Sequence, residues 1–138
     1  MSTLTVETTI PATPERLWGI LQDFGGIARW NRNLAASRIL DGKAPSGVGA
    51  ERQCDLSDGR SWIRERVVEW TPGESMKIEI FEGTMPLSEA QVTLGLRRLG
   101  PGTTAAFMTM SYRPRMGVFG ALLDGAQDGL DVRKRRPG

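Results

Sequence analysis

The 138-residue sequence contains no histidine and one cysteine, Cys54. The lack of histidine excludes a Ser-His-Asp triad, a Cys-His pair and every histidine-ligated metal site. One cysteine cannot form an intramolecular disulfide, a thiolate zinc cluster or an iron–sulfur cluster. No run of acidic residues has the spacing of a metal site, so we expect neither a metal nor a cofactor. We interpret Cys54 as a structural residue.

Long hydrophobic runs are also missing. No apolar stretch approaches the ~20 residues that a membrane-spanning helix needs. The first residues have neither the basic nor the apolar region of a signal peptide. We therefore expect a cytoplasmic protein without stable membrane insertion.

The charge is unevenly distributed. The sequence pI is 9.1, but the four residues at 133–136 are all basic, and residues 1–132 carry a formal net charge of −2. A slightly acidic body gives no reason to expect a nucleic-acid partner. We expect a single domain over residues 1–130 and a disordered basic tail over 131–138.

Alternation of apolar and polar residues predicts a first strand over residues 3–10. Thr13-Pro14 then provides an N-cap and a proline at the first helical position, which predicts a short helix over 14–22. Gly25-Gly26 is interpreted as a break, followed by one further helical turn over 27–31.

Strand patterns separated by turn residues occupy the middle of the chain. They cover residues 34–40, 50–57, 61–70, 75–81, 87–98 and 103–113. Asp58-Gly59 is a two-residue hairpin signal, and an apolar stripe from Val118 to Leu130 predicts a C-terminal helix. Together these elements predict an α+β fold built on an antiparallel sheet. The predicted interior face comprises Met76, Ile78, Ile80, Leu87, Ala90, Val92, Leu94 and Leu96, with Phe119, Leu122, Leu123 and Ala126 from the helix.

Three passages resemble a known superfamily in their order and spacing. They are V-E-T-T-I-P-A-T-P-E-R-L-W at the start, G-V-G-A-E-R with D-G-R and R-E-R-V between Val48 and Val67, and L-G-P-G-T-T-A-A-F-M-T-M-S-Y near the end. This set is similar to the START and pollen-allergen (SRPBCC) superfamily, in its polyketide cyclase/dehydrase branch. The resemblance implies the helix-grip fold. This fold is a curved seven-stranded antiparallel sheet with two short helices after the first strand and a C-terminal helix packed across it.

The resemblance also implies a cavity between the sheet and the last helix, which in this superfamily takes lipids, sterols, polyketides or plant hormones. The expected lining is Trp30, Ile63, Glu65, Val67, Ile78, Ile80, Met85, Leu87, Ala90, Val92, Met108, Met110, Tyr112, Phe119, Leu122 and Leu123. The predicted last helix departs from the family in being short and rich in glycine, which leaves the size and closure of the cavity open.

Glu65 is the candidate catalytic or anchoring residue. In the resembling hormone receptors, the acid of the matching E-R motif points into the cavity, and a carboxylate in an apolar chamber would have a raised pKa. The flanking Arg64 and Arg66 fit an exposed strand face equally well, so both orientations stay open. Glu69 shares the parity of Glu65 if the strand has no bulge, and two carboxylates on one face would suggest an acid/base pair. The favoured interpretation is that a bulge switches the faces and that Trp70, Trp62 or Val68 lies inward instead.

Aromatic and amide residues near the predicted helices have two interpretations. Trp18 is better explained as a seal between helix and sheet, whereas Trp30 fits a seal or a cavity wall equally well. Asn31 and Asn33 could contact a ligand at the cavity mouth or stabilise a turn.

Three functions follow from these features. The first is binding of a small apolar or amphipathic ligand by a carrier or sensor. The second is a polyketide cyclase or dehydratase that uses a buried carboxylate. The third is a protein-interaction module similar to a co-chaperone. Binding ranks first, and homodimerisation stays open.

Overall fold

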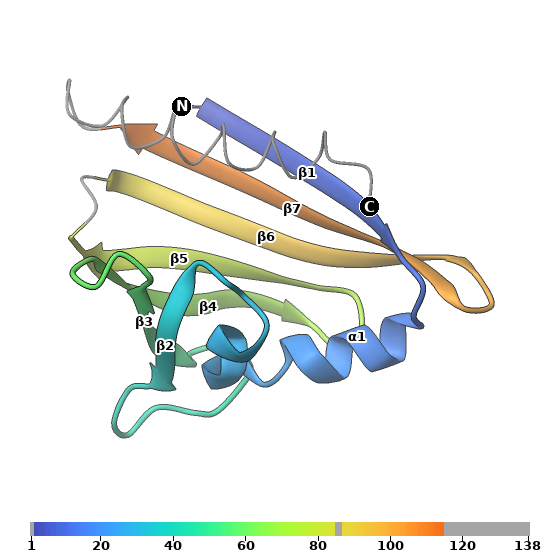
Figure 1. Ribbon diagram of the computed structural model, residues 1–138, viewed down its shortest axis with the longest axis horizontal. Helices are drawn as coiled ribbons and strands as arrows, with labels where there is room; N and C mark the ends of the chain where they lie inside the picture. Colours follow the sequence, from blue (N-terminus) through green and yellow to red (C-terminus); the bar gives the residue numbers. More distant parts are fainter. Residues whose placement is uncertain (1, 85–86, 115–138) are drawn as a thin grey trace.

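A curved antiparallel sheet of seven strands forms the body of the molecule (Figure 1). The computed structural model describes residues 2–84 and 87–114. The strands are β1 (Ser2–Ile10), β2 (Leu34–Ile39), β3 (Glu51–Leu56), β4 (Trp62–Thr71), β5 (Ser75–Gly83), β6 (Leu87–Gly100) and β7 (Thr103–Pro114). Their order across the sheet is β1-β7-β6-β5-β4-β3-β2, so all strands after β1 pair with their neighbours in sequence. The predicted strands are confirmed, with ends that differ by one or two residues.

The helix α1 (Pro14–Leu21) begins as predicted. The Thr13 hydroxyl accepts a hydrogen bond from the backbone N–H of Arg16 at 3.2 Å, which satisfies one free donor of the first turn. Trp18 on this helix is buried and meets Trp70 of β4 edge-on, with ring centroids 5.0 Å apart. This contact seals α1 against the sheet, as the sequence suggested for Trp18.

The second helical element starts earlier than predicted. It is a 3-10 helix, η1 (Phe24–Arg29), and it includes the two glycines that the sequence interpretation treated as a break. The reason is close packing, because a Cβ on Gly25 would lie 2.8 Å from the Ile39 side chain. Ser37 of β2 fixes this turn by donating to the Gly25 carbonyl at 2.7 Å and accepting from the Ala28 N–H at 3.0 Å.

The predicted interior face of the late strands is confirmed where side chains are described. Met76, Ile78, Ala90 and Val92 are buried, and Ile80, Leu94 and Leu96 are partly buried against the same core. The side chain of Leu87 and the helix residues Phe119, Leu122, Leu123 and Ala126 lie outside the described part of the structure. The predicted C-terminal helix and the basic tail lie outside it too.

Two bulges interrupt the pairing of β4 with β5. One falls between Arg64 and Glu65, and the other between Val67 and Glu69. The second bulge places Glu69 on the exposed side and lets Trp70 pack against the core. Glu65 and Glu69 therefore do not share a face, because the bulge at Val68 reverses the alternation and Trp70 turns inward, as the favoured interpretation of the sequence expected.

No helix in residues 2–84 and 87–114 is long and apolar enough to cross a membrane. The same residues contain no group of three acidic or cysteine side chains arranged to hold a metal ion.

The pairing of β6 with β7 generates a stability prediction at Gly95. Gly95 faces Phe107 across the two strands, and a Cβ at Gly95 would lie 2.0 Å from the Phe107 ring. We expect Gly95→Ala to destabilise the protein by about 1–3 kcal/mol in urea unfolding, because the ring must move. In a Phe107→Ala background the same change should be neutral or stabilising, since alanine is otherwise better tolerated in a strand than glycine. An equal loss in both backgrounds would contradict this explanation.

Candidate functional site

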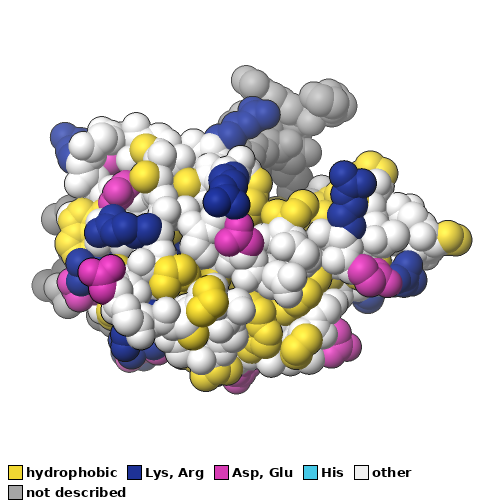
Figure 2. All heavy atoms as spheres, turned by 90° about the horizontal axis from the view of Figure 1, so that it is seen from below, with side chains coloured by type: hydrophobic (Ala, Val, Ile, Leu, Met, Phe, Trp, Pro, Cys, Tyr) yellow, Lys and Arg dark blue, Asp and Glu magenta, His cyan; other side chains and the backbone are white. Residues whose placement is uncertain are grey.

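A cavity of about 790 Å³ lies on the inward face of the sheet, with walls from β1, α1, the η1–β2 connection and strands β3 to β7. Most of its lining is apolar. Figure 2 views the molecule from the side of α1 and η1, and hydrophobic side chains are exposed among charged ones on this face. The space is large enough for a drug-sized or lipid-like molecule.

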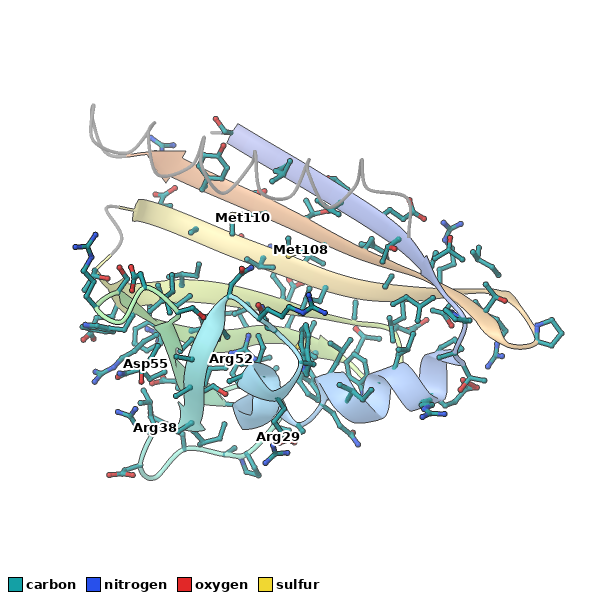
Figure 3. All side chains as sticks on the ribbon, in the orientation of Figure 1. Arg29, Arg38, Arg52, Asp55, Met108 and Met110 are labelled. Carbon is teal, nitrogen blue, oxygen red and sulfur yellow. The ribbon has the colours of Figure 1, made fainter. Side chains whose placement is uncertain are left out.

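Eight of the residues predicted to line the cavity do so in the structure. They are Trp30, Ile63, Glu65, Ile78, Ile80, Val92, Met108 and Met110. They come from the η1–β2 connection and from strands β4, β5, β6 and β7, so residues distant in sequence meet at one space. Figure 3 labels Met108 and Met110 on β7 in the upper part of the view and Arg52 in the lower part, and all three line the cavity.

Three predicted residues are buried elsewhere. Val67 packs in the core with Trp18 and Phe24, while Ala90 and Tyr112 pack against each other. They lie on the inward faces of their strands, but they are not among the residues that line the cavity. The side chain of Leu87 is not described, and Met85, Phe119, Leu122 and Leu123 lie outside the described residues.

The first strand and α1 contribute walls that the sequence reasoning did not assign to the cavity. These residues are Val6, Thr8, Ile10, Leu17, Ile20 and Leu21. Their alternation and helical spacing were visible in the sequence. The missing step was the pairing of β1 with β7, which brings the first strand beside Met108 and Met110.

A buried ion pair forms the polar part of the wall. The Arg52 guanidinium donates to Glu65 Oε1 at 3.0 Å, and Arg52 and Glu65 are 3% and 6% exposed. Arg52 also donates to the Phe24 carbonyl at 2.9 Å, and its guanidinium lies 3.8 Å from the centre of the Phe24 ring. Glu65 therefore faces inward, which is one of the two orientations that the sequence left open. It is not the isolated acid that the sequence argument assumed.

The partner of Glu65 could have been found from the sequence. In a hairpin with a two-residue turn, residues equally far from the turn face each other. Counting outward from Asp58-Gly59 pairs Arg52 with Glu65, and the structure has this pairing. The sequence reasoning considered the charges beside Glu65 on its own strand and omitted the charge across the hairpin.

Cys54 lies two residues after Arg52, on the same face of β3, and also lines the cavity. Its thiol donates to Glu65 Oε1 at 3.3 Å. Burial, supported by the neighbouring Glu65 carboxylate, raises the pKa of the Cys54 thiol to about 12. A thiol of this kind stays protonated near neutral pH, so it serves as a hydrogen-bond donor rather than as a nucleophile.

The connection between η1 and β2 forms a solvent-exposed part of the cavity wall, which we call the mouth. Trp30, Asn31, Arg32 and Asn33 all line it. Trp30 is 45% exposed, so it forms a wall at the rim rather than a seal in the core. Asn31 also has a turn role, because its side-chain oxygen accepts from the Asn33 N–H at 3.0 Å.

Comparison with known proteins identifies the family of this chain. A family model described as polyketide cyclase/dehydrase and lipid transport matches residues 1–132. The chain belongs to this family. A search of curated protein sequences finds no match.

Several solved structures have the same fold as this member of the polyketide cyclase/dehydrase and lipid transport family, although their sequences are only 15% to 19% identical to it. XoxI from Bacillus cereus is 19% identical with a TM-score of 0.76, covering 95% of this chain and 92% of its own. A START superfamily protein from Mycobacterium smegmatis is 15% identical with a TM-score of 0.74 and the same coverages. The Zhui aromatase/cyclase from a Streptomyces species is 15% identical with a TM-score of 0.71, covering 84% of this chain and 70% of its own. These likenesses establish the helix-grip fold.

The buried pair generates a prediction for the stability of this family member. We expect Glu65→Gln and Arg52→Met each to lower the free energy of unfolding by about 3–5 kcal/mol, because each leaves a buried charge without its partner. The double variant Arg52→Met/Glu65→Leu should recover part of the loss. Arg97→Met, which breaks the exposed pair with Glu7, should cost only about 0–1 kcal/mol. Urea unfolding measures all four, and a Glu65→Gln cost equal to that of the surface control would contradict the prediction.

The raised pKa of Cys54 generates a second prediction. At pH 8 a thiol with a pKa of about 12 is ionised in only about one molecule in ten thousand. Iodoacetamide should therefore label the native protein very slowly, label it faster as the pH rises, and label it promptly once urea has unfolded it. Mass spectrometry gives the labelled fraction, and prompt labelling of the native protein at pH 8 would refute this assignment.

Proposed function

We propose that the protein binds a small apolar or amphipathic ligand in the cavity on the inward face of its sheet, as a carrier or sensor. The observation that carries this proposal is the cavity of about 790 Å³ with its largely apolar lining. Transfer of apolar ligand surface from water into such a space is favourable by roughly 25 cal/mol per Å². Flexible methionines on β7 suit ligands of varied shape, because thioether side chains adapt to irregular gaps.

The buried charges support binding over catalysis. A cyclase or dehydratase needs a group that donates or accepts a proton beside the substrate. Among the described residues, Glu65 is the carboxylate that lines the cavity, and its Oε1 already accepts from Arg52 and Cys54. The fold shared with the Zhui aromatase/cyclase keeps this second function as the alternative. The cavity itself favours both over a pure protein-interaction module.

A substitution that fills the cavity tests the proposal. Ala106 on β7 lines the cavity, so Ala106→Leu adds a side chain to the empty space. Binding of the neutral fluorescent probe N-phenyl-1-naphthylamine should weaken by about tenfold or more, which corresponds to about 1.4 kcal/mol. The matched control is Ala36→Leu on β2, an exposed position outside the cavity lining.

Fluorescence titration with both variants gives the answer. The control should bind the probe like the unchanged protein. Absence of probe binding by the unchanged protein, or an equal effect of the two substitutions, would overturn the proposed function.

A further inference from the structure

The charges on the cavity walls do not balance. The described residues that line the cavity include three charged side chains, Arg32, Arg52 and Glu65. Arg52 and Glu65 neutralise each other inside the wall. The Arg32 guanidinium is exposed and makes no ion pair or hydrogen bond with residues 2–84 or 87–114. Among the described lining residues, one positive charge is therefore uncompensated, and it lies at the mouth.

The backbone that carries Arg32 is held in place on both sides. The Asn31 N–H donates to the Ile27 carbonyl at 3.0 Å. Ser57, just after β3, donates from its hydroxyl to the Arg32 carbonyl at 3.0 Å and from its N–H to the Asn33 carbonyl at 2.9 Å. A side chain presented from a fixed backbone loses less conformational entropy when it binds a ligand.

Asn31, which precedes Arg32 in the sequence and also lines the cavity, adds a second donor. Its side-chain oxygen is engaged by the Asn33 N–H, which leaves the amide NH₂ as the group available to a ligand. A guanidinium and an amide NH₂ both donate hydrogen bonds, and an oxyanion accepts them. Exposed apolar side chains, Ile20 and Trp30, line the cavity at the same mouth. Hydrogen-bond donors that suit an anion thus lie at the mouth of a largely apolar cavity.

Arg52 does not compete for this role. It is 3% exposed, and its donors are directed to Glu65 and to the Phe24 carbonyl. A ligand anion that reached it would have to replace a buried carboxylate, whereas Arg32 meets the anion without losing a protein partner.

We propose that the ligand is a monoanionic amphiphile. Its apolar chain or ring system occupies the cavity, and its single carboxylate binds the Arg32 guanidinium and the Asn31 amide at the mouth. This inference rests on the proposed function and adds the charge and orientation of the ligand.

Three probes built on a twelve-carbon chain, with different head groups, test the inference. They are dodecanoate, dodecanol and dodecyltrimethylammonium, each titrated at pH 8 to displace N-phenyl-1-naphthylamine. The unchanged protein should bind dodecanoate most tightly. Arg32→Gln should weaken dodecanoate by about three- to tenfold and leave dodecanol unchanged, because only the ion-pair contribution is lost. Arg32→Glu should reverse the preference, so that dodecyltrimethylammonium binds more tightly than dodecanoate.

Arg38→Gln is the matched control. Arg38 on β2 is an exposed cation that does not line the cavity. This variant removes the same charge and should bind dodecanoate like the unchanged protein.

The outcomes separate the two proposals. Equal binding of dodecanoate and dodecanol, or an equal loss with Arg32→Gln and Arg38→Gln, overturns the monoanion inference while ligand binding stands. Failure of all three probes and of the fluorescent probe overturns the proposed function, and the inference with it.

Discussion

The ion pair of Arg52 and Glu65 is the interaction on which the other features of the site depend. Removing two charges from water costs several kcal/mol per ion, and a buried pair is stable only when its remaining hydrogen-bonding groups are satisfied. Here the guanidinium has a carboxylate on β4, a carbonyl on η1 and the face of the Phe24 ring. One side chain on β3 thereby ties β4 to the 3-10 helix η1, which directly precedes the connection that forms the cavity mouth.

The pair also determines what the cavity can recognise. Because Arg52 and Glu65 neutralise each other, the inner wall offers a ligand apolar surface and few unpaired polar groups. Cys54 belongs to the same arrangement, since its protonated thiol donates to the carboxylate. Among the described lining residues, Arg32 at the mouth is the one uncompensated charge. Water can solvate it there in the unliganded protein. Arg52 is thus the buried arginine of the cavity wall, and Arg32 is the exposed one that the proposed ligand anion would contact.

The sequence predicted the strands and their inward faces because both depend on local alternation. Met76, Ile78, Ala90 and Val92 follow a strict period of two and are buried as expected. The errors arose where contacts between distant segments override the local pattern. Gly25 and Gly26 signal a helix end by propensity, but the approach of Ile39 makes glycine necessary inside η1. Arg52 was overlooked as the partner of Glu65 because cross-strand pairing, rather than adjacency, decides which charges meet.

The bulge at Val68 shows how one extra residue sets the chemistry of the site. With regular alternation along β4, Glu69 would follow Glu65 and Val67 on the inward face, and a second buried carboxylate would need a second buried cation. The bulge removes this requirement by turning Glu69 outward and Trp70 inward. Trp70 then packs against Trp18 of α1 and closes that end of the core with apolar surface. A single arginine therefore suffices to neutralise the inward face of β4, and the remaining wall is free to be apolar.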